Sequence, residues 1–369
     1  ILFELARGER TVVDTQERRG GAQLAFSPDG RWLAYTKERM NYLADLMLYE
    51  IATGTITRVT DGMADVTDLA FSPDGTQLFF AASTNSGPAQ VGLDMSSQER
   101  PRRVALYALV LAADGASPLA PRTGDEAREA DDEDDEEADE NAELPETRID
   151  LDGLEGRIVA LPIAERNHYD LGVAKDGDLL FVRGVQAGAS VTPDGENARA
   201  ENTLLRYDFE KRELETLAEG VTALEVSSDG GFLLARRAAG GWATAEIKDK
   251  FELEPLDTSG LKLMIDPRTE WAQIFEDAVR MQPAFFYAEN MHGLDWDATA
   301  ERYRALLPHV GRREDLNALI VELIAELQVG HNRAGGGDLE TGEDPGAGAL
   351  LGADFRAENG RWRIARILT

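Results

Sequence analysis

The sequence predicts a multidomain protein that starts with an incomplete β-propeller of about four blades, continues into a small α-helical subdomain, and ends in the first hairpin of a β-rich domain. Three observations predict this fold class. A phrase with an Asp-Gly turn recurs four times, the hydrophobic period changes from 2 to 3.6 after Gly260, and an Asn-Gly pair separates two alternating arms near the end. We therefore expect propeller blades over residues 1–260, the helical subdomain over 261–338, and a linker with the hairpin over 339–369.

The recurring phrase marks the turns between neighbouring strands. Its full form, Leu-Ala-Phe-Ser-Pro-Asp-Gly, occurs twice, and two weaker copies keep the Asp-Gly pair. Proline presets φ at the first central turn position, aspartate supplies a side-chain acceptor, and glycine adopts backbone angles that other residues avoid. The four aspartates are Asp29, Asp74, Asp176 and Asp229, which lie 45, 102 and 53 residues apart. A repeat of roughly 40–50 residues built of short strands is typical of a propeller blade, and the long gap predicts one blade with an insertion.

Both ends of the chain indicate a fragment. Four blades fit between about Ala22 and Pro255, and residues 1–13 resemble the outer strands of an earlier blade. Because a propeller closes its ring to remove exposed strand edges, a chain that opens within a blade is expected to lack N-terminal sequence. The chain also begins with Ile1 rather than Met, and it stops in a two-stranded hairpin, which is not stable alone.

The charge of the protein argues against two classes of partner. Of its 369 residues, 69 are Asp or Glu and 38 are Lys or Arg, which gives a net charge of −31. Neither nucleic acid nor a membrane is therefore expected as a partner, and no apolar stretch is long enough to span a bilayer. Fourteen carboxylates fall between Asp125 and Glu146. Such charge density predicts a solvated, disordered insertion at about 124–147. A calcium-binding or partner-docking loop is the less favoured alternative, because the glycine spacing of a calcium loop is missing.

Three helices are expected in the subdomain over 261–338. Thr269 can cap the first, whose end is disturbed by Pro283, and Asp297 can cap the second, which is stopped by Pro308. The third is the clearest, and Gly330 stands where a left-handed C-terminal residue belongs. The expected apolar positions are Trp271, Ile274, Phe275 and Ala278 in the first helix, and Leu316, Leu319, Ile320, Leu323, Ile324 and Leu327 in the third.

Composition leaves few candidates for catalysis or cofactor binding. The chain has no cysteine, which excludes disulfides, cysteine-ligated zinc, iron–sulfur clusters and thiol catalysis. The four histidines are His168, His292, His309 and His331, and no two have the i, i+4 helical spacing of a metal site. H-E-x-x-H, G-x-S-x-G, P-loop and dinucleotide-binding motifs are all missing from the sequence. We therefore expect no cofactor and no metal.

The residues after Trp271 point to a known family. The stretch from Trp271 to Asp338 resembles the first catalytic subdomain of tricorn-type serine proteases, and its most specific run is Asn-Met-His-Gly-Leu-Asp-Trp at 290–296. Residues 151–162 are similar to the second propeller of that family, and residues 350–367 are similar to the first strands of its PDZ domain. The resemblance therefore covers nearly the whole chain, loosely in the propeller and closely after Trp271.

The resemblance implies a serine peptidase that hydrolyses oligopeptides through a Ser-His-acid mechanism, with propellers that control substrate access. It places the general base at His331, just after the third helix, and assigns the nucleophilic serine and its acidic helper to a second subdomain that this chain does not contain. It also implies a closed homo-oligomer and a cytoplasmic location. One residue departs from the pattern of the family, because Gly330 stands where a serine or threonine usually precedes the histidine.

Other interpretations of these residues are simpler. Without the motif, a histidine after a helix would be taken to interact with the negative end of the helix dipole. His292 is expected to cap or pack the turn between two helices, His168 is expected to be solvated in a propeller loop, and Trp271 and Trp296 are expected to anchor helix packing. For the whole protein, the alternative is a non-enzymatic, TolB-like propeller scaffold with a helical interaction module.

Overall fold

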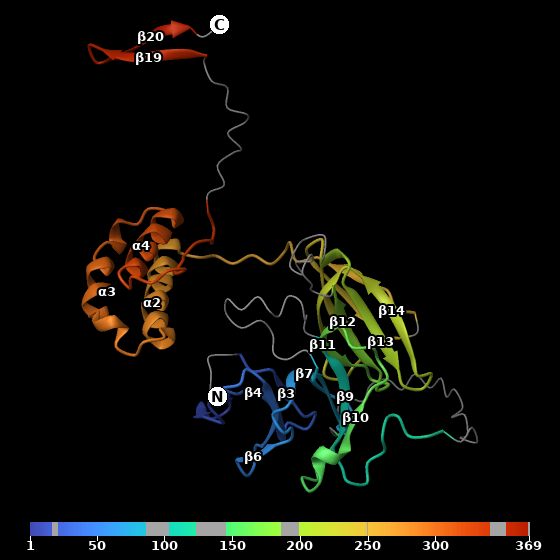
Figure 1. Ribbon diagram of the computed structural model, residues 1–369. Helices are drawn as coiled ribbons and strands as arrows, with labels where there is room; N and C mark the ends of the chain where they lie inside the picture. Colours follow the sequence, from blue (N-terminus) through green and yellow to red (C-terminus); the bar gives the residue numbers. More distant parts are fainter. Residues whose placement is uncertain are drawn as a thin grey trace. The chain divides into compact units, whose positions relative to one another are not determined.

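The chain divides into two compact units, Ile1–Leu261 and Lys262–Thr369, in a computed structural model (Figure 1). The residues that this structure describes are 1–16, 21–85, 103–122, 145–185, 199–248, 250–339 and 352–367.

The first unit is a partial β-propeller, which confirms the fold class predicted from the spacing of the turns. Its described residues form four four-stranded antiparallel sheets, each an up-and-down meander in sequence order. A separate strand pair, β1 (Leu2–Glu4) and β2 (Glu9–Thr11), precedes them. The sheets are β3 (Leu24–Phe26), β4 (Trp32–Glu38), β5 (Ala44–Glu50) and β6 (Thr55–Arg58); β7 (Asp65–Phe71), β8 (Gln77–Ser83), β9 (Ala105–Val110) and β10 (Ile158–Ala160); β11 (Asn167–Val173), β12 (Leu179–Gly184), β13 (Thr203–Asp208) and β14 (Glu213–Glu219); and β15 (Val221–Val226), β16 (Phe232–Arg237), β17 (Trp242–Glu246) and β18 (Glu254–Leu256).

The Asp-Gly phrases form the turns between the first and second strands of their sheets. Between β3 and β4, the Ser27 hydroxyl donates to the Asp29 carboxylate at 2.6 Å, and the backbone N–H of Trp32 donates to the Ser27 hydroxyl at 3.0 Å. Gly30 has a φ of 67°, the left-handed region that glycine adopts at no steric cost. The turns at Asp74 and Asp229 repeat the serine-to-aspartate bond, so one short phrase specifies the same corner in three sheets.

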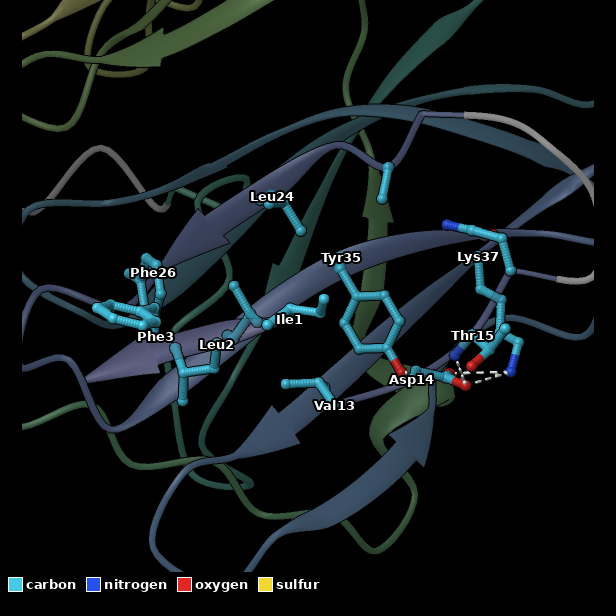
Figure 2. Close-up of a pocket in the computed structure, with 13 residues that line it drawn as sticks. Ile1, Leu2, Phe3, Val13, Asp14, Thr15, Leu24, Phe26, Tyr35 and Lys37 are labelled. Carbon is cyan, nitrogen blue, oxygen red and sulfur yellow. Dashed lines mark hydrogen bonds and ion pairs between the residues drawn. The ribbon is translucent and has the colours of Figure 1, made fainter. Parts of the chain in front are cut away.

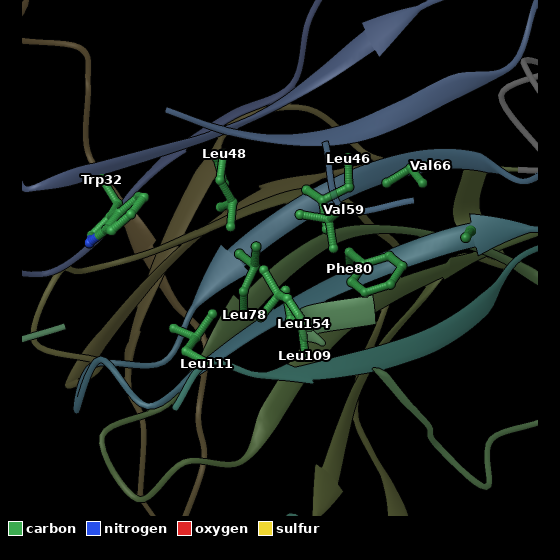
Figure 3. Close-up of a cluster of buried hydrophobic side chains, with 12 residues drawn as sticks. Trp32, Leu46, Leu48, Val59, Val66, Leu78, Phe80, Leu109, Leu111 and Leu154 are labelled. Atoms are coloured by element: carbon green, nitrogen blue, oxygen red, sulfur yellow. The ribbon is translucent and has the colours of Figure 1, made fainter. Parts of the chain in front are cut away.

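Neighbouring sheets share their hydrophobic cores. Ala34 lies opposite Leu48 in the register of β4 and β5, and both side chains are fully buried. Figure 3 shows this layer, in which side chains of the first sheet meet side chains of the second. A sheet with both faces covered explains why β4, β5 and β8 are nearly continuous apolar runs rather than alternating ones.

A chain of aspartate hydrogen bonds links the first strands of three consecutive sheets. Asp68 on β7 and Asp170 on β11 lie at register shifts, with left-handed φ values of 47° and 52°. The Asp170 N–H donates to Asp68 Oδ1 at 2.9 Å, and the Leu224 N–H on β15 donates to Asp170 Oδ2 at 3.1 Å. Burial raises the pKa of Asp170 to about 6, and the negative charges of Asp68 and Glu225 act in the same direction. The β-bulges thus aim each carboxylate at the next sheet.

The acidic insertion falls between β9 and β10. Residues 123–144 are outside the described part of the chain, so the predicted disordered insertion at about 124–147 lies largely outside the described residues. On one flank, Arg122 donates to the carbonyl oxygen of Phe209, between β13 and β14, at 3.0 Å. On the other flank, the Thr147 N–H donates to Asp29 Oδ2 at 2.9 Å. The flanks are therefore anchored on the third and the first sheet, and the chain then forms η2 (Leu154–Arg157) before β10.

The second unit contains helices and a hairpin. The helices are α2 (Pro267–Phe285), α3 (Trp296–Arg304) and α4 (Arg313–Ala325), with the short 3₁₀ turns η3 (Met291–Gly293) and η4 (Leu307–His309). The apolar stripe predicted on α4 is buried against Phe275 of α2. Strands β19 (Ala353–Glu358) and β20 (Arg361–Ile367) pair across Asn359 and Gly360, whose φ values of 53° and 72° fit a type I′ turn.

Two predicted helix starts are wrong by two or three residues. Asp266, not Thr269, caps α2: its carboxylate accepts from the Arg268 N–H, and the Thr269 hydroxyl donates to it from inside the helix. Asp295, not Asp297, caps α3 and accepts from the Ala298 N–H at 3.0 Å. In both cases an aspartate lies just upstream of the predicted cap, and a carboxylate there satisfies the free N–H groups of the first turn equally well.

Helix α2 continues through Pro283, because another residue satisfies the carbonyl that the proline leaves free. A helical residue at position 283 would normally donate its N–H to the carbonyl of Val279. The Trp296 indole N–H donates to that carbonyl instead, at 2.9 Å. Helix α3 ends at Arg304, before the predicted stop at Pro308, which lies in η4.

Candidate functional site

His331 lies in a tight segment that follows α4. The Gln328 N–H donates to the Ala325 carbonyl at 3.0 Å, and Gln328 has a left-handed φ of 54°. The prediction that Gly330 supplies this left-handed residue is wrong, because the chain already reverses at Gln328. His331 is itself left-handed, with a φ of 62°. This conformation costs about 1–2 kcal/mol for a residue with a side chain, and strained residues of this kind concentrate at functional sites.

The segment after α4 is fixed by two asparagine side chains. The Asn332 amide donates to the carbonyl of Ile324, near the end of α4, at 3.4 Å. The Asn317 amide on α4 donates to the carbonyl of Gly336 at 2.9 Å and accepts from Arg313 at 3.1 Å. These bonds hold the chain against the helix just beyond His331, so the imidazole is carried by an anchored backbone.

The His331 side chain is exposed and stands at a pocket of about 400 Å³. One wall is formed by Met281, Gln282, Phe285, Phe286 and Tyr287 at the end of α2, and the other by residues 329–332. Among the described residues, His331 has no hydrogen-bond partner, so both imidazole nitrogens are open to a group brought from outside this unit. This aromatic wall is not predicted from the sequence, although the run Phe-Phe-Tyr at 285–287, shortly after Pro283, could have indicated it.

The other histidines occupy different environments. His292 lies in η3 with a left-handed φ of 58°, its backbone N–H bonds to the Asn290 side chain, and its Nε2 is hydrogen-bonded to the Tyr287 hydroxyl. His309 is exposed in η4. The prediction that His168 is solvated is wrong: it lies on β11, is 4% exposed, and contacts the edge of Phe181. Burial lowers the pKa of His168 to about 4, and the positive charge of Arg183 acts in the same direction.

Further pockets lie in the propeller unit. Figure 2 shows one of about 400 Å³, where Phe3, Leu24 and Phe26 line apolar walls. Its carboxylate, Asp14, already accepts from the Tyr35 hydroxyl and the Lys37 ammonium, both at 2.7 Å, and these bonds lower its pKa even though burial opposes them.

Another propeller pocket, of about 530 Å³, lies between the third and fourth sheets. It is lined by Arg199, Arg236 and Arg237 together with the polar side chains of Tyr169 and Asn202. Three arginines in one pocket of a protein with a net charge of −31 are suited to an anionic group.

Metal and membrane sites receive no support from the described residues. In that part of the chain, no three His, Asp or Glu side chains gather as metal ligands would. None of its helices has both the length and the apolar character needed to cross a bilayer. The sequence after Ser259 contains no serine, so the second unit offers His331 no serine hydroxyl of its own.

Comparisons with known families match both units. The family described as "Tricorn protease second beta propeller domain" matches residues 1–242, and "Tricorn protease C1 domain" matches residues 267–325. The second match ends at Ala325, six residues before His331.

Curated proteins named as tricorn protease homologs align with nearly the full length of this chain. Tricorn protease homolog 1 of Streptomyces coelicolor is 31% identical over all of this chain, which covers 35% of that protein. Tricorn protease homolog of Saccharolobus solfataricus is 25% identical over 99% of the chain, which covers 33% of it. A crystal structure of the tricorn protease superposes with a TM-score of 0.68 at 20% identity, over 99% of this chain and 34% of that one. The chain thus spans about a third of the length of these relatives.

Proposed function

This chain belongs to the tricorn protease family, and on that premise we propose that the protein containing it is a serine-type peptidase that hydrolyses oligopeptides. In this proposal His331 is the general base, the second unit is the first half of the catalytic site, and the propeller controls access of peptides to it. The family resemblance assigns the nucleophilic serine and its acidic helper to a part of the protein outside this chain, and the second unit itself has no serine.

The observation that carries the proposal is the environment of His331. An exposed imidazole, held in a left-handed backbone conformation at the edge of a pocket, would be accessible to a hydroxyl from another subdomain, and this supports the proposal. A histidine that served only the helix dipole would need neither the strained backbone nor the pocket.

The chemistry assigned to His331 is proton transfer. The imidazole accepts the proton of the serine hydroxyl as its oxygen bonds to the carbonyl carbon of the peptide. It then gives that proton to the leaving amine as the carbon–nitrogen bond breaks, which leaves an acyl-enzyme. In the second half-reaction, water gives its proton to the imidazole, attacks the acyl group and restores the serine.

The propeller unit contributes the entry route in this proposal. Peptide substrates end in a carboxylate. Among the described residues of the propeller, Arg199, Arg236 and Arg237 line a pocket that would bind such a group through its charge. A channel along the axis of a propeller would exclude folded proteins, so the proposed substrates are short. We also propose that the whole protein is a homo-oligomer in the cytoplasm, as the family resemblance implies.

The test replaces His331 by alanine in the full-length protein. We expect kcat/KM for a fluorogenic oligopeptide to fall by at least about 10³-fold, because serine hydrolysis without its base retains only transition-state binding. Circular dichroism should be unchanged, since the side chain is exposed. His309→Ala is the matched control, because it removes another exposed histidine from the same unit.

Two outcomes would refute the assignment. Full activity of His331→Ala would remove this residue from the mechanism. The absence of peptide hydrolysis by the wild-type protein would favour the alternative, a propeller scaffold whose helical unit is an interaction module.

A further inference from the structure

The pocket beside His331 has a wall of exposed apolar side chains. Met281, Phe285 and Tyr287 are 48, 62 and 72% exposed, although the core of the same unit accommodates other aromatic residues completely. Exposed apolar side chains that are clustered at one pocket indicate a binding surface, whereas single exposed apolar side chains scattered over a protein do not.

The aromatic part of this wall is held in place before any ligand arrives. The Tyr287 ring contacts the rings of Phe286 and His292, with centroid separations of 4.9 and 5.1 Å, and its hydroxyl is hydrogen-bonded to His292. Phe286 is buried, and its N–H donates to the Gln282 carbonyl at 2.8 Å, which fixes the last turn of α2, where Phe285 lies. A preorganised wall loses little conformational entropy when it binds a ligand.

The pocket also lacks the charge that dominates the rest of the molecule. None of its lining residues is Asp, Glu, Lys or Arg, whereas the whole chain carries 69 acidic and 38 basic residues. Its polar side chains are the amides of Gln282 and Asn332, the imidazole itself, and Tyr287, whose hydroxyl is hydrogen-bonded to His292. Its volume of about 400 Å³ is at the small end of ligand pockets and suits one large uncharged side chain with its flanking backbone.

The chemistry of acyl transfer identifies which side chain that is. The imidazole must approach the leaving amine closely in order to protonate it, so the residue that carries this amine lies beside the ring. We propose that the pocket binds an apolar side chain of the residue immediately after the scissile bond, and that Met281, Phe285 and Tyr287 set this leaving-group specificity. The assignment rests on the proposed function, because it takes His331 as the base.

The test measures kcat/KM of the full-length protein for quenched fluorescent peptides that differ only at the residue after the scissile bond. We expect wild type to prefer leucine over aspartate there by at least about tenfold, the discrimination of which one apolar pocket is capable. Phe285→Ser should bring this ratio to about threefold or less. Leu306→Ser is the matched control: Leu306 is 50% exposed in the same unit, does not line the pocket, and should leave the ratio unchanged.

A second variant gives the pocket a new preference instead of removing one. Met281→Glu places a carboxylate in the wall at an exposed helical position, where it is compatible with folding. We expect a peptide with lysine after the scissile bond to be cleaved at least about tenfold better, relative to leucine, than by wild type, because opposite charges attract in a partly enclosed site.

The outcomes separate this inference from the function on which it rests. Three results would overturn the pocket assignment while leaving a His331-dependent peptidase intact. The ratios of kcat/KM could be unchanged in both variants, or wild type could be indifferent to the residue after the scissile bond. The preference could also concern the residue before the scissile bond instead. An equal loss for every peptide in Phe285→Ser would also overturn it, because the wall would then serve contact with the remainder of the protein. A wild type that cleaves no peptide would overturn the proposed function and this inference together.

Discussion

The buried His168 should make the stability of the propeller depend on pH, and the size of this effect follows from its surroundings. Its side chain is 4% exposed, it lies across from Arg183 in the register of β11 and β12, and Arg166 is also nearby. These features lower its pKa from 6.5 to about 4, although a hydrogen bond with the backbone of Val104 opposes the shift. The folded protein therefore resists a proton that the unfolded chain accepts readily.

The sign and magnitude follow from proton linkage. Above pH 6.5 both states are neutral at this residue and no stability is lost; between pH 6.5 and 4 only the unfolded state binds the proton, so stability falls as the pH falls. For these two pKa values the loss at pH 5 is about 2 kcal/mol, since each unit of pKa difference corresponds to about 1.4 kcal/mol. In a unit of this size, that lowers the melting temperature by roughly 4–8 °C.

Asp170, two residues away, acts in the opposite direction. Its pKa is raised from 3.8 to about 6, so its contribution to stability increases as the pH falls through 6 towards 3.8. The wild-type profile alone therefore underestimates the histidine effect.

The assay compares the wild-type chain with His168→Leu by calorimetric unfolding at pH 8 and pH 5.

The leucine variant removes the titrating group and fills the same apolar site beside Phe181. We expect its loss of stability between pH 8 and pH 5 to be about 2 kcal/mol smaller than that of wild type. His309→Gln, which removes an exposed histidine from the other unit, should reproduce the wild-type difference. An identical pH dependence in wild type and His168→Leu would refute the reasoning and show that the folded state binds a proton at this position.

Three other substitutions test separate contacts. Asp170→Asn keeps an acceptor for the Leu224 N–H, favours the left-handed backbone and removes a buried charge near Asp68. Calorimetry at pH 8 should therefore show that the free energy of unfolding of the first unit rises by about 1–2 kcal/mol, whereas a decrease would mean that the charge itself strengthens the link between sheets. Trp296→Phe leaves the Val279 carbonyl without a partner, so urea unfolding should show that the free energy of unfolding of the second unit falls by about 1–3 kcal/mol. The control Trp362→Phe, at a residue 77% exposed, should leave that free energy unchanged, and equal effects of the two variants would contradict the proposed role of the indole N–H. Gly330→Ser adds a hydroxyl where nothing outside the neighbouring residues lies within 4 Å of the new Cβ, so folding should be unaffected. In the proposed full-length peptidase, kcat should rise if imidazole orientation limits the rate, and a fall in kcat would mean that Gly330 is required for the active geometry.

The repetitive part of the fold could be predicted because each blade encodes its corners locally. The Asp-Gly turns specify strand ends through bonds within five residues, as at Ser27 and Asp29, and the stripe on α4 specifies a buried helix face. The predictions that failed depend on partners distant in sequence. The continuation of α2 through Pro283 requires the Trp296 indole, and the burial of His168 requires the neighbouring strand with Phe181. Local patterns contain neither contact.

The candidate site shows the same division between local and distant information, and this limits what a site motif can predict. Sequence resemblance locates His331 but assigns the reversal of the chain to Gly330, whereas the backbone is left-handed at Gln328 and at His331 itself. The position of the imidazole depends on the carbonyl groups at the C-terminal end of helix α4, because the Asn332 side chain donates a hydrogen bond to one of them, the carbonyl of Ile324. Since the strain at His331 is retained by contacts within the second unit, the proposed base is positioned independently of the proposed nucleophile. A peptidase whose base and nucleophile lie on separate subdomains requires this order, because only a base fixed by its own subdomain presents the same geometry each time the other subdomain docks.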